Sequence, residues 1–421
     1  MAEYKATVIV PVYNVEKFLR GCIDSLIEQT VGFESIEVVL VNDGSTDGSE
    51  EICKDYADRY GNVFLYSKEN EGLSKTRNYG IARAHGKYIF YLDSDDKLKP
   101  NTIKAVTEFF DSVYDEVDLV TYRIIQYYNE RPFIVHYRYR TLTKTGVYDL
   151  NDPKNRYITQ TNINICVKNR GEDNLLFDET PSFHHEDEKY CCEMLREKMK
   201  IGFCAEGEYV YNRDNTESIV SSKFSPENIF ETSMAFYEAL FDSFGRYVPT
   251  YYQSIVFNDL RWKLKDGKLL PVHLEAEEWE TASRRIDRLL AMIEEDTVVL
   301  HPSVSENMMF YWLMRRPNSH PIVLCEEDGI GIVSAGRTLY SAQKIKLSVK
   351  DGRVRLISPI FFFLRKNSVK LMINSKETDF SFEKNMKNTD ILDFMPSFDI
   401  DEQSETDIKV IINSREYRCT K

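Results

Sequence analysis

Hydrophobic runs alternate with amphipathic stretches along the first hundred residues of the chain. Four runs have the length and apolar character of buried strands, namely ATVIVPVY (6–13), IEVVLV (36–41), VFLY (63–66) and YIFYL (88–92). The stretches between them carry apolar residues at helical spacing, and we expect Asn14 to cap the first helix and Gly86 to follow the third as its C′ residue. This alternation is typical of a parallel sheet covered by helices on both faces.

The pattern changes at about Asp118. Segments 118–128 and 133–141 alternate in the manner of antiparallel strands around a turn, and residues 226–314 predict helices. Later segments predict strands, including a hairpin with Asp351-Gly352 as its turn. We therefore expect three parts: an α/β domain in residues 1–225, a helical region in 226–318, and a small β-sandwich-like domain in 319–421.

Composition narrows the class of protein. The chain has 421 residues, enough for two or three domains, and its net charge of −14 argues against broad contact with nucleic acid. No apolar run approaches the roughly 18–20 residues that span a bilayer. We therefore expect a cytoplasmic protein with at most peripheral association with the inner face of the membrane. The eight cysteines are scattered without a C-x-x-C pair, which predicts reduced thiols and no zinc site.

The loops at the carboxyl ends of the strands carry the candidate chemistry, because ligands of such sheets bind there. Asp43 follows the second strand, where a carboxylate can accept hydrogen bonds from a base or ribose; capping of the next helix is an equal alternative. Asn70 and Gly72 precede a helix whose first turns hold Lys75 and Arg77. Free amides and cations suit a diphosphate, although a capped helix with surface cations is the simpler explanation.

The acidic cluster DSDD (93–96) follows the fourth strand directly. Two aspartates separated by one residue can hold Mg²⁺ or Mn²⁺ together with phosphate oxygens. An EF-hand calcium loop is excluded, because Leu98 and Lys104 stand where it needs glycine and glutamate. A phosphatase-type D-x-D with Asp93 as nucleophile usually begins a domain, whereas three strand–helix units precede this one. A solvated turn stays open as the third explanation.

These motifs, in this order, resemble the inverting family-2 glycosyltransferases of the GT-A fold, and bacterial surface-polysaccharide and wall-teichoic-acid enzymes in particular. The resemblance rests on VIVPVYNVEKFLRGCIDSLIEQT, EVVLVNDGSTDGS, ENEGLSKTRNYGIARAHGKYIFYLDSDD and HHEDEKY (184–190). It covers roughly the first 220 residues. It implies that residues 1–225 form a GT-A domain, the Rossmann-like fold of the nucleotide-diphospho-sugar transferases.

The resemblance also implies roles for individual residues. The nucleotide would lie beside Pro11, Tyr13 and Glu16. Asp43 would recognise its uracil, and Asn70 and Gly72 would line the pocket. Arg77 and Arg213 would lie near the diphosphate or the donor sugar. Asp95 would bind the metal directly, Asp93 would contact the ribose or the metal, and Asp96 would cap the following segment.

The segment HHEDEKY corresponds to an acceptor-site motif of that family. By this resemblance Asp187, with Glu186 as the second candidate, is the general base that takes the proton of the acceptor hydroxyl. An acidic first helical turn stabilised by the helix dipole would explain the same charges without catalysis. We expect His184 and His185 at the surface or in the acceptor pocket.

The implied activity is inverting hexosyl transfer, dependent on Mn²⁺ or Mg²⁺, from a UDP-sugar to a hydroxyl of a cell-surface glycan or teichoic-acid-type acceptor. The helical region is expected to help form the acceptor groove. The C-terminal domain is expected to bind the acceptor or to join protomers in a homo-oligomer. Two alternatives stay open: a phosphotransferase or phosphatase that uses Asp93, and a non-catalytic scaffold that binds nucleotide sugars.

Overall fold

A computed structural model describes most of the chain. The described residues are 4–129, 131–180, 185–215, 229–265, 275–319, 321–326, 329–350, 353–364, 369–385, 393–399, 407–412 and 415–420. The chain divides into two compact units, Met1–Ile255 and Val256–Lys421, and the division falls within helix α9 (Thr250–Lys265). Among the described residues, no helix combines the length and the hydrophobicity needed to cross a membrane.

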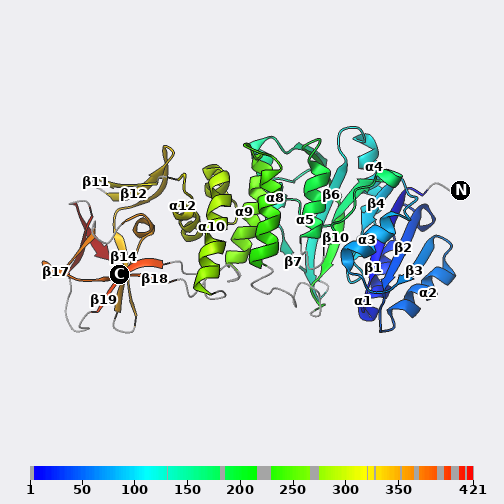
Figure 1. The fold of residues 1–421 in the computed structure, drawn as a ribbon, viewed down its shortest axis with the longest axis horizontal. Coiled ribbons are helices and arrows are strands. Elements are labelled where there is room, and N and C mark those ends of the chain that lie inside the picture. The colour runs from blue at the N-terminus through cyan, green and yellow to red at the C-terminus, as the bar shows by residue number, and fades with distance from the viewer. Residues whose placement is uncertain are drawn as a thin grey trace. The chain divides into compact units, whose positions relative to one another are not determined.

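The first unit is built around a 10-stranded sheet whose main order is β3-β2-β1-β4-β9-β6-β10-β5. Its N-terminal strands are β1 (Ala6–Val12), β2 (Ile36–Asp43), β3 (Val63–Lys68) and β4 (Tyr88–Tyr91). They pair in parallel and lie side by side in Figure 1, which confirms the predicted parallel sheet. Their carboxyl ends therefore lie at one edge, and the candidate residues follow there.

Helices cover both faces of these strands. The helices α1 (Glu16–Ile27), α2 (Ser49–Arg59) and α4 (Thr102–Ser112) share one hydrophobic core with Val8 and Val10 of β1. Helix α3 (Leu73–Ile81) lies on the other face, where Gly80 packs so closely on Ile9 that a Cβ at Gly80 would come within 2.5 Å of Ile9 Cγ2. Successive side chains of β1 point to opposite faces, so one apolar strand serves both layers.

The expectation for Asn14 is wrong. Val15 occupies the N-cap position of α1, and Asn14 itself adopts a positive φ of 47°. Its Oδ1 accepts a hydrogen bond from Thr46 N at 2.8 Å. Asn14 therefore connects the loop after β1 to the loop after β2 instead of starting the helix.

The expectation for Gly86 is also wrong. Helix α3 ends at Ile81, five residues before it. A Cβ at Gly86 would lie 2.4 Å from the backbone of Ala6 and Thr7, closer than real Cβ atoms approach other atoms. The glycine is needed because the chain passes close to β1, and not because it ends a helix.

The second half of this sheet contains β9 (Ile165–Lys168), β6 (Leu119–Tyr128), β10 (Lys200–Asn212) and β5 (Lys97–Leu98), with β7 (Arg131–Val135) on β6 and β8 (Gly146–Asp149) on β10. β6 is antiparallel to β7, which confirms the antiparallel pair expected around the turn, and it is also antiparallel to β9. Its pairing with β10 is parallel, which the sequence did not predict. The predicted strand 133–141 ends at Val135, and Tyr137–Arg140 form a 3₁₀ turn. β5 pairs with β10 and brings Tyr209 opposite Leu98, close to the acidic cluster.

The described residues of this unit also form α5 (Glu186–Leu195), which starts with the acidic turn predicted from the sequence, and α8 (Met234–Asp242). A π-helical turn, Ile229–Ser233, precedes α8. Tyr252, at the start of α9, donates a hydrogen bond to the carbonyl of Cys192 on α5 at 2.9 Å. Helices α5 and α9 are thereby joined within the first unit.

The second unit combines helices with mostly antiparallel strands. Its helices include α10 (Ala276–Met292), α11 (Glu295–Val299) and α12 (Glu306–Arg315). Its strands are β11 (Ile322–Glu326), β12 (Gly329–Ser334), β13 (Arg337–Ala342), β14 (Ile345–Lys350), β15 (Arg353–Ile357), β16 (Val369–Ile373), β17 (Lys376–Thr378), β18 (Ser381–Asn385), β19 (Asp393–Asp399), β20 (Ile408–Ile412) and β21 (Arg415–Thr420).

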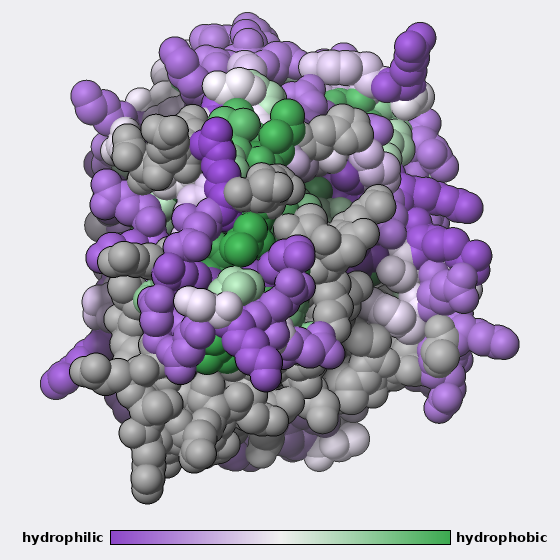
Figure 2. Space-filling model, turned by 90° about the vertical axis from the view of Figure 1, so that its left-hand side faces the viewer, coloured by the Kyte–Doolittle hydropathy of each residue, from purple (hydrophilic) through white to green (hydrophobic). Residues whose placement is uncertain are grey.

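These strands form a three-stranded sheet, β11-β12-β13, and an eight-stranded sheet, β17-β16-β20-β21-β14-β15-β19-β18. The antiparallel pair β14–β15 confirms the predicted hairpin, whereas its turn Asp351-Gly352 lies outside the described residues. Ile322 and Leu324 of the edge strand β11 are exposed. Figure 2 shows hydrophobic side chains among hydrophilic ones on a face of this unit.

Candidate active site

The loops after β1 and β2 are hydrogen-bonded to each other at the carboxyl edge of the sheet. Glu16 Oε2 accepts a hydrogen bond from Gly48 N at 2.8 Å, and Asp47 Oδ2 accepts one from Glu16 N at 3.1 Å. Pro11 is buried in β1, whereas Tyr13, just beyond its end, is 48% exposed. The loops thus form a fixed surface that leaves the Tyr13 ring accessible.

Asp43 connects the end of β2 to the loop before α3. Its carboxylate is buried, forms an ion pair with Lys68, and accepts hydrogen bonds from the backbone N of Glu71 and Gly72, each at 3.0 Å. It does not cap helix α2, whose N-cap is Gly48, so the capping alternative is wrong. Asp43 therefore fixes the loop of Asn70 and Gly72 against β2.

Asp96 is held by strand β10. Tyr209 Oη donates a hydrogen bond to Asp96 Oδ2 at 2.8 Å, and Asn212 N donates one to Oδ1 at 2.7 Å. The same Tyr209 hydroxyl accepts a hydrogen bond from Asp93 N at 3.1 Å. Burial, and then the charges of Asp95 and Asp93, raise the pKa of Asp96 well above its ordinary value. Asp96 is structural as expected, but it binds β10 instead of capping the following segment.

The other two aspartates of the cluster keep partial access to solvent. Asp95 Oδ2 accepts a hydrogen bond from Asn215 Nδ2 at 2.8 Å, which connects the cluster to the segment after β10. Burial, and then the charge of Asp93, raise the pKa of Asp95. Arg213 lies in the same segment; it is exposed and its guanidinium lies 5.7 Å from the ring centroid of Tyr211.

Arg77 brings the two halves of the predicted site together. Its side chain is only 1% exposed, which overturns the alternative that it is a surface cation. Nη2 lies 3.0 Å from Asp93 Oδ1, and Nη1 lies 2.6 Å from Asp187 Oδ1 and 3.7 Å from Glu186 Oε1. One guanidinium therefore faces a carboxylate from the end of β4 and two from the first turn of α5.

Asp187 retains 26% exposure of its side chain despite this contact. Burial raises its pKa, Arg77 opposes the shift, and the neighbouring Glu186 and Asp93 reinforce it. A carboxyl group of raised pKa and partial access is suited to exchange protons with a bound hydroxyl.

The residue before this acidic turn is buried. His185 Nε2 lies 2.8 Å from Ser233 Oγ, and its ring stacks on Phe236 at a centroid distance of 5.3 Å. The expectation of a surface position is therefore wrong for His185, which ties the start of α5 to the turn before α8. His184 lies outside the described residues.

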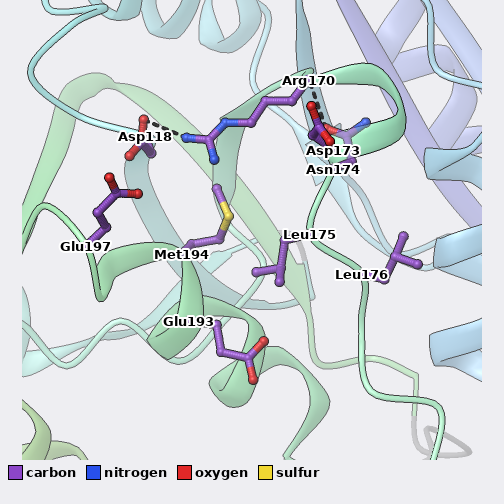
Figure 3. Close-up of a pocket in the computed structure, with 9 residues that line it drawn as sticks. All are labelled: Asp118, Arg170, Asp173, Asn174, Leu175, Leu176, Glu193, Met194 and Glu197. Carbon is purple, nitrogen blue, oxygen red and sulfur yellow. Dashed lines mark hydrogen bonds and ion pairs between the residues drawn. The ribbon is translucent and has the colours of Figure 1, made fainter. Parts of the chain in front are cut away.

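A cavity of about 320 Å³ lies at the other end of α5 (Figure 3). Its lining comes from the loop after β9 and from the C-terminal part of α5, and Arg170 Nη2 contacts Asp118 Oδ1 there at 2.9 Å. None of the site residues predicted from the sequence lines it. The cavity is therefore separate from the cluster around Arg77.

Several residues of the site carry no recognisable sequence signal. Tyr209 and Phe177 belong to no motif in the sequence, and each contacts the acidic groups or Arg77 only through the fold. Asn78 directly follows Arg77 in a segment that the sequence marks as important, and its amide contacts the backbone of Phe177. Only Asn78 could have been suspected, because of its neighbour.

Comparisons with known proteins agree with this arrangement. The family model described as glycosyl transferase family 2 matches residues 7–169. The uncharacterized glycosyltransferase EpsJ of Bacillus subtilis (strain 168) is 33% identical over 243 residues, which cover 55% of this chain and 69% of EpsJ. The chain belongs to glycosyl transferase family 2.

A second relative of this family-2 chain is the minor teichoic acid biosynthesis protein GgaB of Bacillus subtilis (strain 168). It is 33% identical over 316 residues, which cover 74% of this chain. The matching part is 35% of GgaB, so the chain spans about a third of that relative's length.

Solved structures confirm the fold of this family-2 chain. Residues 1–349 of S. aureus TarS, in complex with UDP-GlcNAc, align with a TM-score of 0.58 at 20% identity over 79% of this chain and 98% of that one. The longer TarS structure aligns with a TM-score of 0.56 at 16% identity over 99% of this chain and 77% of that one. The expected GT-A fold with a β-rich C-terminal region is thereby confirmed.

Proposed function

We propose that this chain is a metal-dependent, inverting glycosyltransferase that uses a UDP-sugar. The observation that carries the proposal is the contact of Arg77 with both Asp93 and Asp187, which places a strand-end carboxylate and a candidate base in one site. The acceptor we propose is a hydroxyl of a cell-surface glycan or teichoic-acid-type polymer. The name of GgaB and the UDP-GlcNAc bound to TarS support these two substrate classes.

The donor nucleotide would lie over the carboxyl ends of β1 and β2. The exposed ring of Tyr13 offers a stacking surface for the base, and the loop of Asn70 and Gly72 is fixed beside it by Asp43. Because both oxygens of Asp43 already accept backbone hydrogen bonds, uracil recognition by Asp43 would require a further lone pair of the same carboxylate.

The residues at the end of β4 fit a hard divalent cation. No group of three or more His, Cys, Asp and Glu side chains arranged for metal binding occurs in the part of the chain that the structure describes. Asp95 and Asp93 offer two carboxylates, however, and Mg²⁺ or Mn²⁺ sites in nucleotide-dependent enzymes often use one or two carboxylates with phosphate and water. A bound ion would supply positive charge to the departing diphosphate.

Asp187 would act on the acceptor. In its charged form it takes the proton of the acceptor hydroxyl while that oxygen attacks the anomeric carbon from the face opposite the leaving group. A single displacement of this kind inverts the anomeric configuration. Arg77 would hold the carboxylate in place without neutralising it by proton transfer. Burial lowers the pKa of Arg77, but the charges of Asp187, Asp93 and Glu186 outweigh it and raise the pKa above its ordinary value.

The proposal is tested with a panel of UDP-sugars and other nucleotide sugars, with and without Mn²⁺, scored for release of the nucleoside diphosphate. We expect hydrolysis of at least one UDP-sugar that depends on the metal. Asp187→Asn should abolish transfer to an acceptor and keep UDP binding, whereas the exposed control Asp115→Asn should change neither. If no donor is hydrolysed and none raises the Tm, the proposal is wrong; a phosphorylated Asp93 would establish the phosphotransferase alternative.

A further inference from the structure

The guanidinium of Arg77 is held by fewer hydrogen bonds than its burial requires. Nη1 and Nη2 contact Asp187 and Asp93, but Nε is buried without a hydrogen-bond partner among the described residues. Two contacts at one end of a planar group leave its tilt about the line through Asp93 and Asp187 free. A further contact with the guanidinium can set that tilt.

That contact comes from Phe177. Its ring centroid lies 5.1 Å from Arg77 Cζ, within the range of a cation–π interaction. The ring is itself fixed on two sides: it stacks on Tyr190 at 4.2 Å and 9°, and meets Tyr91 edge-on at 5.2 Å and 88°. The two tyrosine hydroxyls are 2.8 Å apart, which joins the two supports.

The supports belong to the elements that carry the two carboxylates. Tyr190 lies on α5, one turn after Asp187. Tyr91 is the last residue of β4, two residues before Asp93. Phe177 thus contacts Arg77 and both elements whose carboxylates Arg77 binds.

Asn78 determines the position of the Phe177 backbone. Its Nδ2 donates to the carbonyl of Phe177 at 2.9 Å, and its Oδ1 accepts from Phe177 N at 2.8 Å. Phe177 lies in a segment without helix or strand, so this side-chain amide satisfies the two backbone groups that secondary structure would otherwise pair. Nδ2 also donates to Glu179 Oε1 at 2.8 Å, which extends the contact along the segment.

We propose that Phe177, held by Asn78, is a positioning residue that orients Arg77 between Asp93 and Asp187. Without the ring, Arg77 can tilt and take Asp187 with it, so the base loses its alignment with the acceptor. The donor nucleotide is proposed to lie over the ends of β1 and β2, whereas Phe177 contacts Arg77, β4 and α5, so donor affinity should depend less on Phe177 than turnover does. The catalytic consequence rests on the proposed function of Asp187, whereas the structural consequence for Arg77 does not.

The substitutions that test this are Phe177→Leu, which removes the aromatic face, and Asn78→Asp, which replaces the donor to the Phe177 carbonyl by a carboxylate facing Glu179. Phe133→Leu is the matched control, since Phe133 is 69% exposed. Pentafluorophenylalanine at position 177 preserves size and reverses the sign of the charge on the ring face. It therefore separates a cation–π contact from simple filling of space.

We expect Phe177→Leu and Asn78→Asp to lower kcat for transfer by about 10- to 100-fold with less than about a threefold change in donor KM. The fluorinated ring should also lower kcat, while the Tm should equal that of the wild type. An equal loss of kcat in the Phe133→Leu control, or wild-type kcat in a folded Phe177→Leu protein, would overturn the inference.

If the wild type itself consumes no nucleotide sugar, the proposed function has failed, and crystal structures decide this inference separately. They should show Arg77 tilted away from Asp187 in Phe177→Leu; an unchanged guanidinium contradicts it.

Discussion

Removal of the Tyr209 hydroxyl tests how the acidic cluster is held. This buried hydroxyl accepts a hydrogen bond from Asp93 N at 3.1 Å and donates one to Asp96 Oδ2 at 2.8 Å. Tyr209→Phe leaves the ring in place and deprives both groups of that partner. The loop that carries Asp93 and Asp95 then loses one of its connections to β10.

The cost follows from these two contacts. Loss of the hydrogen bond from the Asp93 amide costs about 1 kcal/mol. Loss of the hydrogen bond to Asp96 costs about 1 kcal/mol if Asp96 is protonated and up to about 3 kcal/mol if it is charged. We therefore expect Tyr209→Phe to lower the free energy of unfolding by about 2–4 kcal/mol. For a unit of this size that corresponds to a decrease in Tm of roughly 4–16 °C. The loss should grow as pH rises, because the stronger bond exists only above the raised pKa of Asp96.

The assay must report on the first unit. Trp262, Trp279 and Trp312 all lie in the second unit, so tryptophan fluorescence is unsuitable. Hydrogen exchange of the Asp93 amide gives a signal from the first unit, and thermal unfolding followed by far-UV circular dichroism gives the Tm of the chain. Tyr128→Phe is the control, since that side chain is exposed. A decrease in Tm no larger than in the control, with unchanged exchange at Asp93, would refute the assigned role of Tyr209.

Three further predictions concern the metal, the base and the packing of the sheet. Asp95→Asn should abolish the stimulation of donor hydrolysis by Mn²⁺, and stimulation equal to that of the wild type would contradict the metal assignment. The rate of transfer should decrease at acid pH with a midpoint above about pH 4, because the carboxylate form of Asp187 is lost as pH falls through its raised pKa. A midpoint below about pH 4 would speak against Asp187 as the base. Gly86→Ala should destabilise the first unit by at least about 1–3 kcal/mol in urea unfolding, whereas Gly61→Ala, with open space at its Cβ, should match the wild type.

The repeating order of strands and helices could be predicted from the sequence, because hydrophobic periodicity depends on a few neighbouring residues. The same local patterns located Asp43 and the DSDD cluster at strand ends and the acidic turn of Glu186 and Asp187 at a helix start. Parallel pairing then implied a common edge for the strand-end residues. Local errors arose where a residue's partner is distant in sequence: Asn14 contacts the loop after β2, and Gly86 lies against β1.

Tertiary structure alone decided how the site is held together. The contact between Arg77 and Asp187 joins residues 110 positions apart, and that between Asn78 and Phe177 joins residues 99 positions apart. Such contacts depend on the order and direction of strands in the sheet, including the parallel pairing of β6 with β10. Hydrophobic periodicity determines which residues are buried, but it does not determine which distant buried residues meet. For that reason the sequence could point to the carboxylates and to Arg77, and only the fold could show that Arg77, the aromatic rings and the Asn78 amide hold them together.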